Sequence, residues 1–154
     1  MGVRALYSVE SSEEHLHPDA SFPSGEIGKL WDALHCLFTG TSAITPIEDS
    51  PLSHAIVGVE ALTPIEVFAE EGVYYGVTPA NEVAPIVRAL ESVDIGSLVA
   101  AADFSRFTEA DIYPPIWDED PEELREDLRE AFHRLLNFYR AAAANNYAVN
   151  VHIS

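Results

Sequence analysis

The first residues that could do chemistry are a carboxylate and an imidazole that lie close together in the sequence. His35 follows Asp32 by three positions and Trp31 by four, and residues at these spacings are neighbours on a helix. A carboxylate beside an imidazole fixes its tautomer and raises its pKa, as a general base requires. Ser42 comes shortly afterwards and could supply a hydroxyl nucleophile, so a Ser-His-Asp hydrolase is one hypothesis.

The same segment has a structural interpretation. On a helical wheel Trp31 belongs to the apolar stripe, Asp32 points away from it and His35 lies at its border. A packed tryptophan beside a histidine that bonds to a loop would explain this pattern without a ligand. A binding pocket around the same residues is the third interpretation.

The turn that follows, T-G-T-S at residues 39–42, offers backbone donors and three hydroxyls that could hold a small anion. It lacks the Gly-Lys-Ser/Thr ending of a phosphate-binding loop, and the C-terminus of a helix repels an anion. The simpler interpretation is a helix-ending turn whose Ser and Thr side chains bond to their own backbone.

A second aromatic group lies in the extended stretch D-I-Y-P-P-I-W at residues 111–117. Tyr113 and Trp117 combine apolar area with a polar group, so they could wall a pocket or lock this loop over the core. The candidate pocket therefore consists of Trp31, Asp32, His35, Thr41, Ser42, Tyr113 and Trp117.

Metal binding has one weak candidate. His15 and His17, with Glu13, Glu14 and Asp19 nearby, could present imidazoles and a carboxylate to an ion. The sequence contains neither H-E-x-x-H nor paired cysteines, and no helix or strand is expected around these residues. We therefore interpret them as a solvated loop and expect no metal and no cofactor.

Acidic residues gather in residues 109–130, where ten of them stand against Arg125 and Arg129. Part of this is ordinary helix design, because acids favour the N-terminal end and Glu/Arg pairs add tenths of a kcal/mol. The surplus of eight exceeds what capping needs, so the segment is either a solvated face or a docking face for a basic protein. The candidate docking residues are Glu122, Glu123, Glu126, Asp127 and Glu130.

The whole chain is acidic, with 26 Asp and Glu against 8 Lys and Arg and a net charge of −18. Phosphate backbones and anionic membranes need cations, so this balance argues against nucleic acid and against membrane docking. A basic protein partner remains possible because complementary charge speeds encounter, while solubility alone would also explain the charge. The sequence leaves the oligomeric state open.

Length and cysteine content fix the broad class. A chain of 154 residues is about one domain, here 1–154, and Cys36 alone cannot form an intramolecular disulfide. The chain has no apolar run of the kind expected for a secretory signal or a membrane span. We expect a cytoplasmic protein.

The elements that would position these residues follow from hydrophobic periodicity. Residues 3–9 and 147–153 alternate as half-buried strands do, and residues 73–77 predict a third strand. Apolar residues at helical spacing predict a helix over 27–38, and Gly40 stands where its C-terminal cap belongs.

Further helices are marked by caps and prolines. Pro51 opens a short helical segment, and Thr78 resembles an N-cap for a helix that Pro85 must kink or postpone. Asp94 could cap a short helix, and Asp120 a long one that ends at Asn145-Asn146. Strands at both ends with helices between predict an α+β domain, whose terminal strands belong to one small sheet.

Several of these stretches together resemble the YfbM-like family of bacterial proteins. The similarity rests on L-W-D-A-L-H at 30–35, L-F-T-G-T-S-A at 37–43, P-L-S at 51–53, L-E-S-V at 90–93, E-A-D-I-Y-P at 109–114 and the final helix and strand. The resemblance implies a mixed domain of helices and strands, and it implies no reaction, cofactor or partner.

The combined prediction is a protein that acts by binding, with catalysis the less favoured possibility. The acidic surface favours an interaction role, for example neutralising a basic protein as an immunity protein does. The alternative is a small-molecule binder or hydrolase that uses a pocket near Trp31, His35 and Tyr113.

Overall fold

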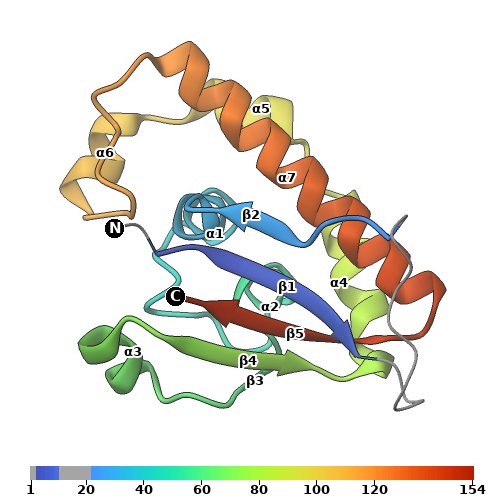
Figure 1. The fold of residues 1–154 in the computed structure, drawn as a ribbon. Helices are drawn as coiled ribbons and strands as arrows, with labels where there is room; N and C mark the ends of the chain where they lie inside the picture. Colours follow the sequence, from blue (N-terminus) through green and yellow to red (C-terminus); the bar gives the residue numbers. More distant parts are fainter. Residues whose placement is uncertain (1–2, 11–21) are drawn as a thin grey trace.

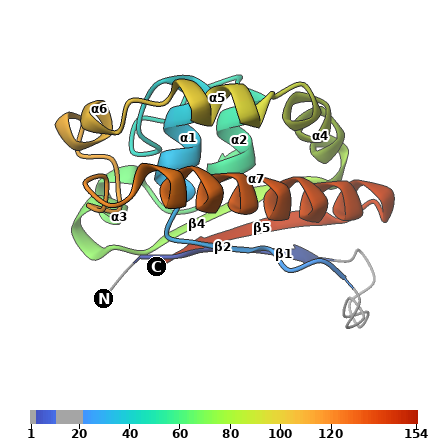
Figure 2. The ribbon, with the colours of Figure 1, turned by 90° about the horizontal axis from the view of Figure 1, so that it is seen from above.

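The protein folds as an α+β domain in which helices cover one face of a five-stranded antiparallel sheet (Figures 1 and 2). The computed structural model describes residues 3–10 and 22–154. The strands run in the order β2-β1-β5-β4-β3 and are β1 (Ala5–Glu10), β2 (Glu26–Gly28), β3 (Glu60–Ala61), β4 (Tyr74–Thr78) and β5 (Ala148–Ile153). The helices are α1 (Trp31–Thr39), α2 (Pro51–Val57), α3 (Ile65–Glu71), the 3-10 helix η1 (Ala80–Glu82), α4 (Val83–Glu91), α5 (Ile95–Ala101), α6 (Phe104–Glu109) and α7 (Pro121–Ala144).

The two terminal strands are neighbours, as the sequence predicted. β1 and β5 pair antiparallel from Ala5 opposite Ile153 to Glu10 opposite Ala148. Alternate residues of the two strands are buried, and helices lie over one face of the sheet (Figure 2), which is the pattern of an antiparallel sheet with one covered face. The buried residues of the pair are Ala5, Tyr7, Val149, Val151 and Ile153.

The long helix α7 crosses this covered face and supplies much of the core (Figure 2). The Asp120 side chain accepts a hydrogen bond from the Glu122 amide, and Pro121 occupies the first turn, where its missing N–H costs nothing. After the helix, Asn146 takes the left-handed conformation, with φ of 54°. Both ends of the predicted long helix are confirmed.

Three tyrosine hydroxyls, which we call the tyrosine clasp, hold helix α2 against the covered face of the sheet. A helix leaves its last carbonyls without intrahelical donors, and in a buried position they need other partners. The donors come from β1, β4 and α7: Tyr7 donates to Ile56 O at 2.7 Å, Tyr74 to Val57 O at 2.6 Å and Tyr139 to Ala55 O at 2.8 Å. Three distant parts of the chain thus meet at one helix end.

The predicted first helix is correct at its end and wrong at its start. Gly40 closes α1 in the left-handed conformation, with its N–H bonded to Cys36 O at 2.8 Å. Ile27, however, lies in β2 and reaches the core from a strand. Gly28, the last residue of β2, has a φ of 67° and turns the chain from the strand toward the helix, so the apolar spacing of Ile27 with the later residues is coincidental.

Thr78 is a second correction, because it caps no helix. It is the last residue of β4, and its buried hydroxyl accepts a hydrogen bond from the Val59 amide at 3.2 Å. The helix after it starts later, at Val83, so that Pro85 falls in the first turn, where no hydrogen-bonded N–H is needed. The short elements β2, β3, α3 and α6 were not predicted, since each has too few residues to display a period.

Candidate functional site

Asp32 is buried, although the helical wheel placed it on the outer side of α1. Its side chain is 1% exposed and accepts three hydrogen bonds: from the Ser42 hydroxyl at 2.7 Å, the Ala43 amide at 2.7 Å and the Tyr113 amide at 2.9 Å. The outward prediction is wrong because two loops cover this side of the helix. Asp32 ties α1 to both loops.

His35 is fully buried, with both ring nitrogens bonded. Nδ1 lies 2.7 Å from the carbonyl oxygen of Thr41, and Nε2 lies 2.7 Å from the Ser53 hydroxyl. A carbonyl can only accept, so Nδ1 carries the proton and Nε2 accepts from Ser53. Burial lowers the pKa of His35, against the opposing effects of the Thr41 hydrogen bond and the Asp32 charge. The side chain is therefore held neutral.

The Ser-His-Asp arrangement is not formed. That mechanism needs the imidazole between the serine and the carboxylate, with the serine open to substrate. Here the Ser42 hydroxyl donates directly to Asp32, and the serine on the His35 ring is Ser53, which is completely buried. Sequence reasoning missed Ser53, because only the packing of α1 against α2 brings it to the histidine.

The turn at residues 39–42 uses its hydroxyls internally. The Thr39 hydroxyl donates to His35 O at 2.9 Å, and the Thr41 hydroxyl donates to Thr45 O at 3.3 Å. The Ser42 hydroxyl is already bonded to Asp32. These contacts agree with the helix-ending turn and leave no hydroxyl directed at an anion.

Trp31 and Tyr113 form a stacked pair that holds the start of β1. Their ring centroids lie 5.7 Å apart with an interplanar angle of 26°. The Trp31 indole donates to Val3 O at 3.0 Å, and the Val3 amide donates to the Tyr113 hydroxyl at 2.6 Å. Both polar groups therefore serve one backbone residue.

Trp117 belongs to a separate aromatic cluster with α6. Its ring stacks on Phe104 at 5.6 Å and meets Phe107 edge-on at 4.9 Å, and its indole donates to Ile112 O at 2.7 Å. The structure thus joins the other six candidate pocket residues through bonds and stacking, with Tyr113 at the edge of that group nearest to Trp117.

Two hollows open on either side of the loop that contains Tyr113. The first, of about 520 Å³, is lined by Thr108, Asp111, Ile112, Tyr113, Pro115, Trp117 and Asp118. The second, of about 740 Å³, is lined by Arg4, Ile27, Gly28, Lys29, Leu30, Tyr113, Pro114, Pro115, Ile116, Glu119, Asp127, Glu130 and Arg134. Trp31, Asp32 and His35 line neither, so the concave surface lies beside the predicted pocket and shares only Tyr113 and Trp117 with it.

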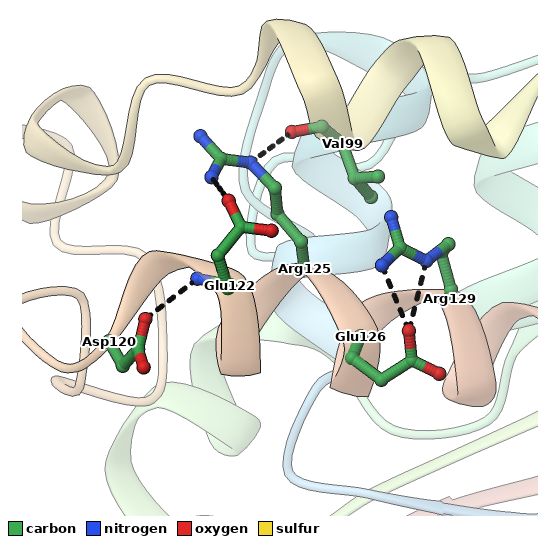
Figure 3. A network of polar contacts seen from close by, with 6 residues as sticks. All are labelled: Val99, Asp120, Glu122, Arg125, Glu126 and Arg129. Carbon is green, nitrogen blue, oxygen red and sulfur yellow. Dashed lines mark hydrogen bonds and ion pairs between the residues drawn. The ribbon is translucent and has the colours of Figure 1, made fainter.

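The acidic segment of α7 is exposed, and its two arginines are occupied (Figure 3). Arg125 pairs with Glu122 at 2.7 Å and also donates to Val99 O at 3.0 Å, which ties α7 to α5. Arg129 pairs with Glu126 at 2.9 Å. Each cation of the segment is therefore used by a neighbouring carboxylate of the same helix.

Three carboxylates of the same helix have no such partner. Within the part of the chain that the structure describes, Glu123, Asp127 and Glu130 form no ion pair or side-chain hydrogen bond. Their spacing of four and three residues places them on one stripe. We call Glu123, Asp127 and Glu130 the acidic stripe.

The residues that the structure describes contain neither a metal-binding group of side chains nor a membrane-spanning helix. Among the described residues no three His, Cys, Asp or Glu side chains gather closely enough to hold a metal ion. The candidate ligands His15 and His17, with Glu13, Glu14 and Asp19, lie outside the described residues. In residues 3–10 and 22–154 no helix has the length and hydrophobicity to cross a membrane.

The five-stranded sheet with helices over one face (Figure 2), and the buried, hydrogen-bonded side chains of Asp32 and His35, define an α+β domain with a hydrophobic core that contains a few satisfied polar groups. The chain belongs to the family described as "Domain of unknown function (DUF1877)", which matches residues 4–152. It is 33% identical to Protein YfbM of Escherichia coli (strain K12) over 131 residues, which are 82% of this chain and 74% of that protein.

A solved structure supports the same assignment. The crystal structure of YfbM from Escherichia coli, described as a protein of unknown function, matches with a TM-score of 0.76 and 25% identity, over 98% of this chain and 99% of that one. The resemblance to the YfbM-like family and the predicted α+β fold are both confirmed.

Proposed function

We propose that this protein is a non-catalytic binding protein whose acidic surface receives a basic protein, as an immunity protein receives the partner that it neutralises. The observation that carries the proposal is the acidic stripe, three exposed carboxylates on α7 without a cation of their own among the described residues. A net charge of −18 adds long-range attraction for a basic surface.

The position of the stripe supports a docking role. Like charges three and four residues apart cost a helix tenths of a kcal/mol, a cost that a cationic partner would remove. Asp127 and Glu130 also line the larger hollow, whose other walls include apolar Pro114, Pro115 and Ile116 and, further round, three cations, Arg4, Lys29 and Arg134. A partner would therefore meet charges of both signs with apolar surface beside them, so its cations would have to lie over the acidic stripe and not over Arg4, Lys29 and Arg134.

The test compares two triple variants that remove the same charge. Glu123→Gln/Asp127→Asn/Glu130→Gln neutralises the acidic stripe, and Glu66→Gln/Glu70→Gln/Glu71→Gln neutralises three exposed acids of α3. A basic protein that co-purifies from the cells of origin is identified by native mass spectrometry, and its dissociation constant is then measured for each variant across a salt series. We expect the stripe variant to bind about tenfold or more weakly and salt to weaken the wild type.

Two results would contradict this function. One is equal loss of affinity in both triple variants, which would mean that only net charge matters. The other is affinity that stays constant as salt rises, which would exclude an electrostatic face.

A second candidate, small-molecule binding, is favoured by the hollow of about 520 Å³ that Tyr113 and Trp117 help to line. The hydrolase form of this hypothesis loses its support, because His35 is buried and Ser42 is bonded to Asp32. A small added mass in native mass spectra that disappears in Thr108→Trp, which places a large ring at the exposed rim, would support the binder. An added mass that survives this substitution would locate the ligand elsewhere.

A further inference from the structure

The smaller hollow, between the end of α6 and the start of α7, has an apolar floor and a charged rim. Ile112 and Trp117 are buried at its base, and Tyr113 and Pro115 form one wall. The carboxylates of Asp111 and Asp118 stand at the rim, where both residues are exposed. None of the residues that line the hollow is basic.

The rim carboxylates have no partner within the described part of the chain. Neither Asp111 nor Asp118 forms an ion pair or a side-chain hydrogen bond there. An anionic ligand would be repelled, and a neutral apolar ligand would gain no contact with the two exposed carboxylates. A cation on an apolar stem fits both the charged rim and the apolar floor of the hollow. The carboxylates and aromatic rings attract the charge, and the apolar floor packs against the stem.

We propose that this hollow, named here the cation pocket, takes an arginine or lysine side chain of the basic partner. The inference rests on the proposed function, because the pocket adjoins the docking surface. Tyr113 and Pro115 line both the cation pocket and the larger hollow, in which Asp127 and Glu130 lie. A partner seated on the acidic stripe would therefore extend a side chain across the loop at residues 113–115 into the pocket.

Such an insertion would anchor the complex. Arginine and aromatic anchors in pockets that exclude water carry much of the affinity of protein interfaces. A volume of about 520 Å³ is large enough for a whole arginine or lysine side chain. The pocket thus supplies the specific contact, while the acidic stripe supplies attraction over a longer range.

The first test needs no partner. N-acetyl-arginine amide and N-acetyl-lysine amide are titrated against the protein, with N-acetyl-norleucine amide as the neutral analogue, and the indole N–H of Trp117 is followed by NMR. We expect both cationic amides to shift this resonance and norleucine amide not to. Asp111→Asn/Asp118→Asn should weaken binding of the cationic amides about three- to tenfold, whereas Glu66→Gln/Glu70→Gln should leave it unchanged. Equal shifts with norleucine amide, or no shift with any probe, would overturn the inference.

The same variants separate the pocket from the proposed function. If the amides do not bind and Asp111→Asn/Asp118→Asn leaves partner affinity unchanged, the pocket inference fails, while loss of affinity in the acidic-stripe variant would still support docking. If the cationic amides bind but neutralising the stripe does not weaken the partner, the docking function fails and the pocket remains a cation site.

Discussion

Two polar regions meet at Tyr113, and they use their charges in opposite ways. Around α1, Asp32 and His35 are buried and every hydrogen-bonding atom of their side chains has a partner. At the surface, by contrast, Asp111 and the acidic stripe are exposed and form no ion pair with a cation of the described residues. Asp32 and His35, the residues that the sequence suggested for catalysis, hold loops in place through their hydrogen bonds. The carboxylates that could bind a partner lie on α7 and in the loop before it.

The largest expected effect is at the centre of the buried region. Asp32→Ala would leave three donors, the Ser42 hydroxyl and the amides of Ala43 and Tyr113, without their acceptor. We expect a loss of about 3 kcal/mol in the free energy of unfolding, measured by urea denaturation. Asp118→Ala, which removes an exposed carboxylate, should change it by less than about 0.5 kcal/mol. If both variants lost a similar amount of unfolding free energy, the buried carboxylate would contribute no more to stability than the exposed one.

The tyrosine clasp on α2 gives the next largest effect. Tyr139→Phe keeps the packed ring and removes the donor to Ala55 O, which stays buried. The free energy of unfolding should fall by about 1–3 kcal/mol. Tyr75→Phe is the matched control, because that side chain is 47% exposed, and it should have almost no effect. A neutral Tyr139→Phe would mean that the carbonyl finds another donor.

These contacts show where prediction from sequence succeeds. Alternation at residues 147–153 and the Asp120-Pro121 start of α7 depend on neighbours in the chain, so the pattern alone identifies the strand and the helix start. The tyrosine clasp depends on β1, β4 and α7 converging on one helix end. No local pattern marks that convergence.

The same limit explains the outcome at the candidate site. A helical wheel treats the side of α1 away from the apolar stripe as solvent, but the amide of Tyr113, 81 positions further along the chain, covers Asp32 there. The sequence did mark Tyr113 and Trp117 as possible walls of a hollow, and they do line one. The acids that share the rim, Asp111 and Asp118, become visible only once the loop is folded.

Acid sensitivity should come from the buried region. Burial lowers the pKa of His35, whereas an unfolded histidine has a pKa of about 6.5. Below that pH the unfolded chain binds the extra proton, so the free energy of unfolding falls as pH falls, by at most about 1.4 kcal/mol per unit for one site, and this loss is absent well above pH 7. Urea denaturation between pH 5 and pH 8 should show a shallower acid loss in His35→Gln.

A second measurement keeps this prediction testable if that variant folds poorly. In the wild type the ring protons of His35, followed by NMR, should show no protonation down to pH values at which exposed histidines are already charged. If His35 instead titrated with the pKa of an exposed histidine, about 6.5, its neutral, buried state would be contradicted.

The smallest expected effect sharpens the comparison on the exposed side. Asp127→Asn removes repulsion from Glu123 and Glu130, so the free energy of unfolding should rise by about 0.2–0.5 kcal/mol. The gain should vanish in high salt, because exposed charges are screened there. Glu122→Gln, on the same helix, breaks the ion pair with Arg125 and should lower the free energy by a similar amount. If Asp127→Asn instead lowers the free energy of unfolding, the Asp127 carboxylate stabilises the folded protein. The acidic stripe would then have a structural role, as Asp32 has, and would not be a surface kept for a partner.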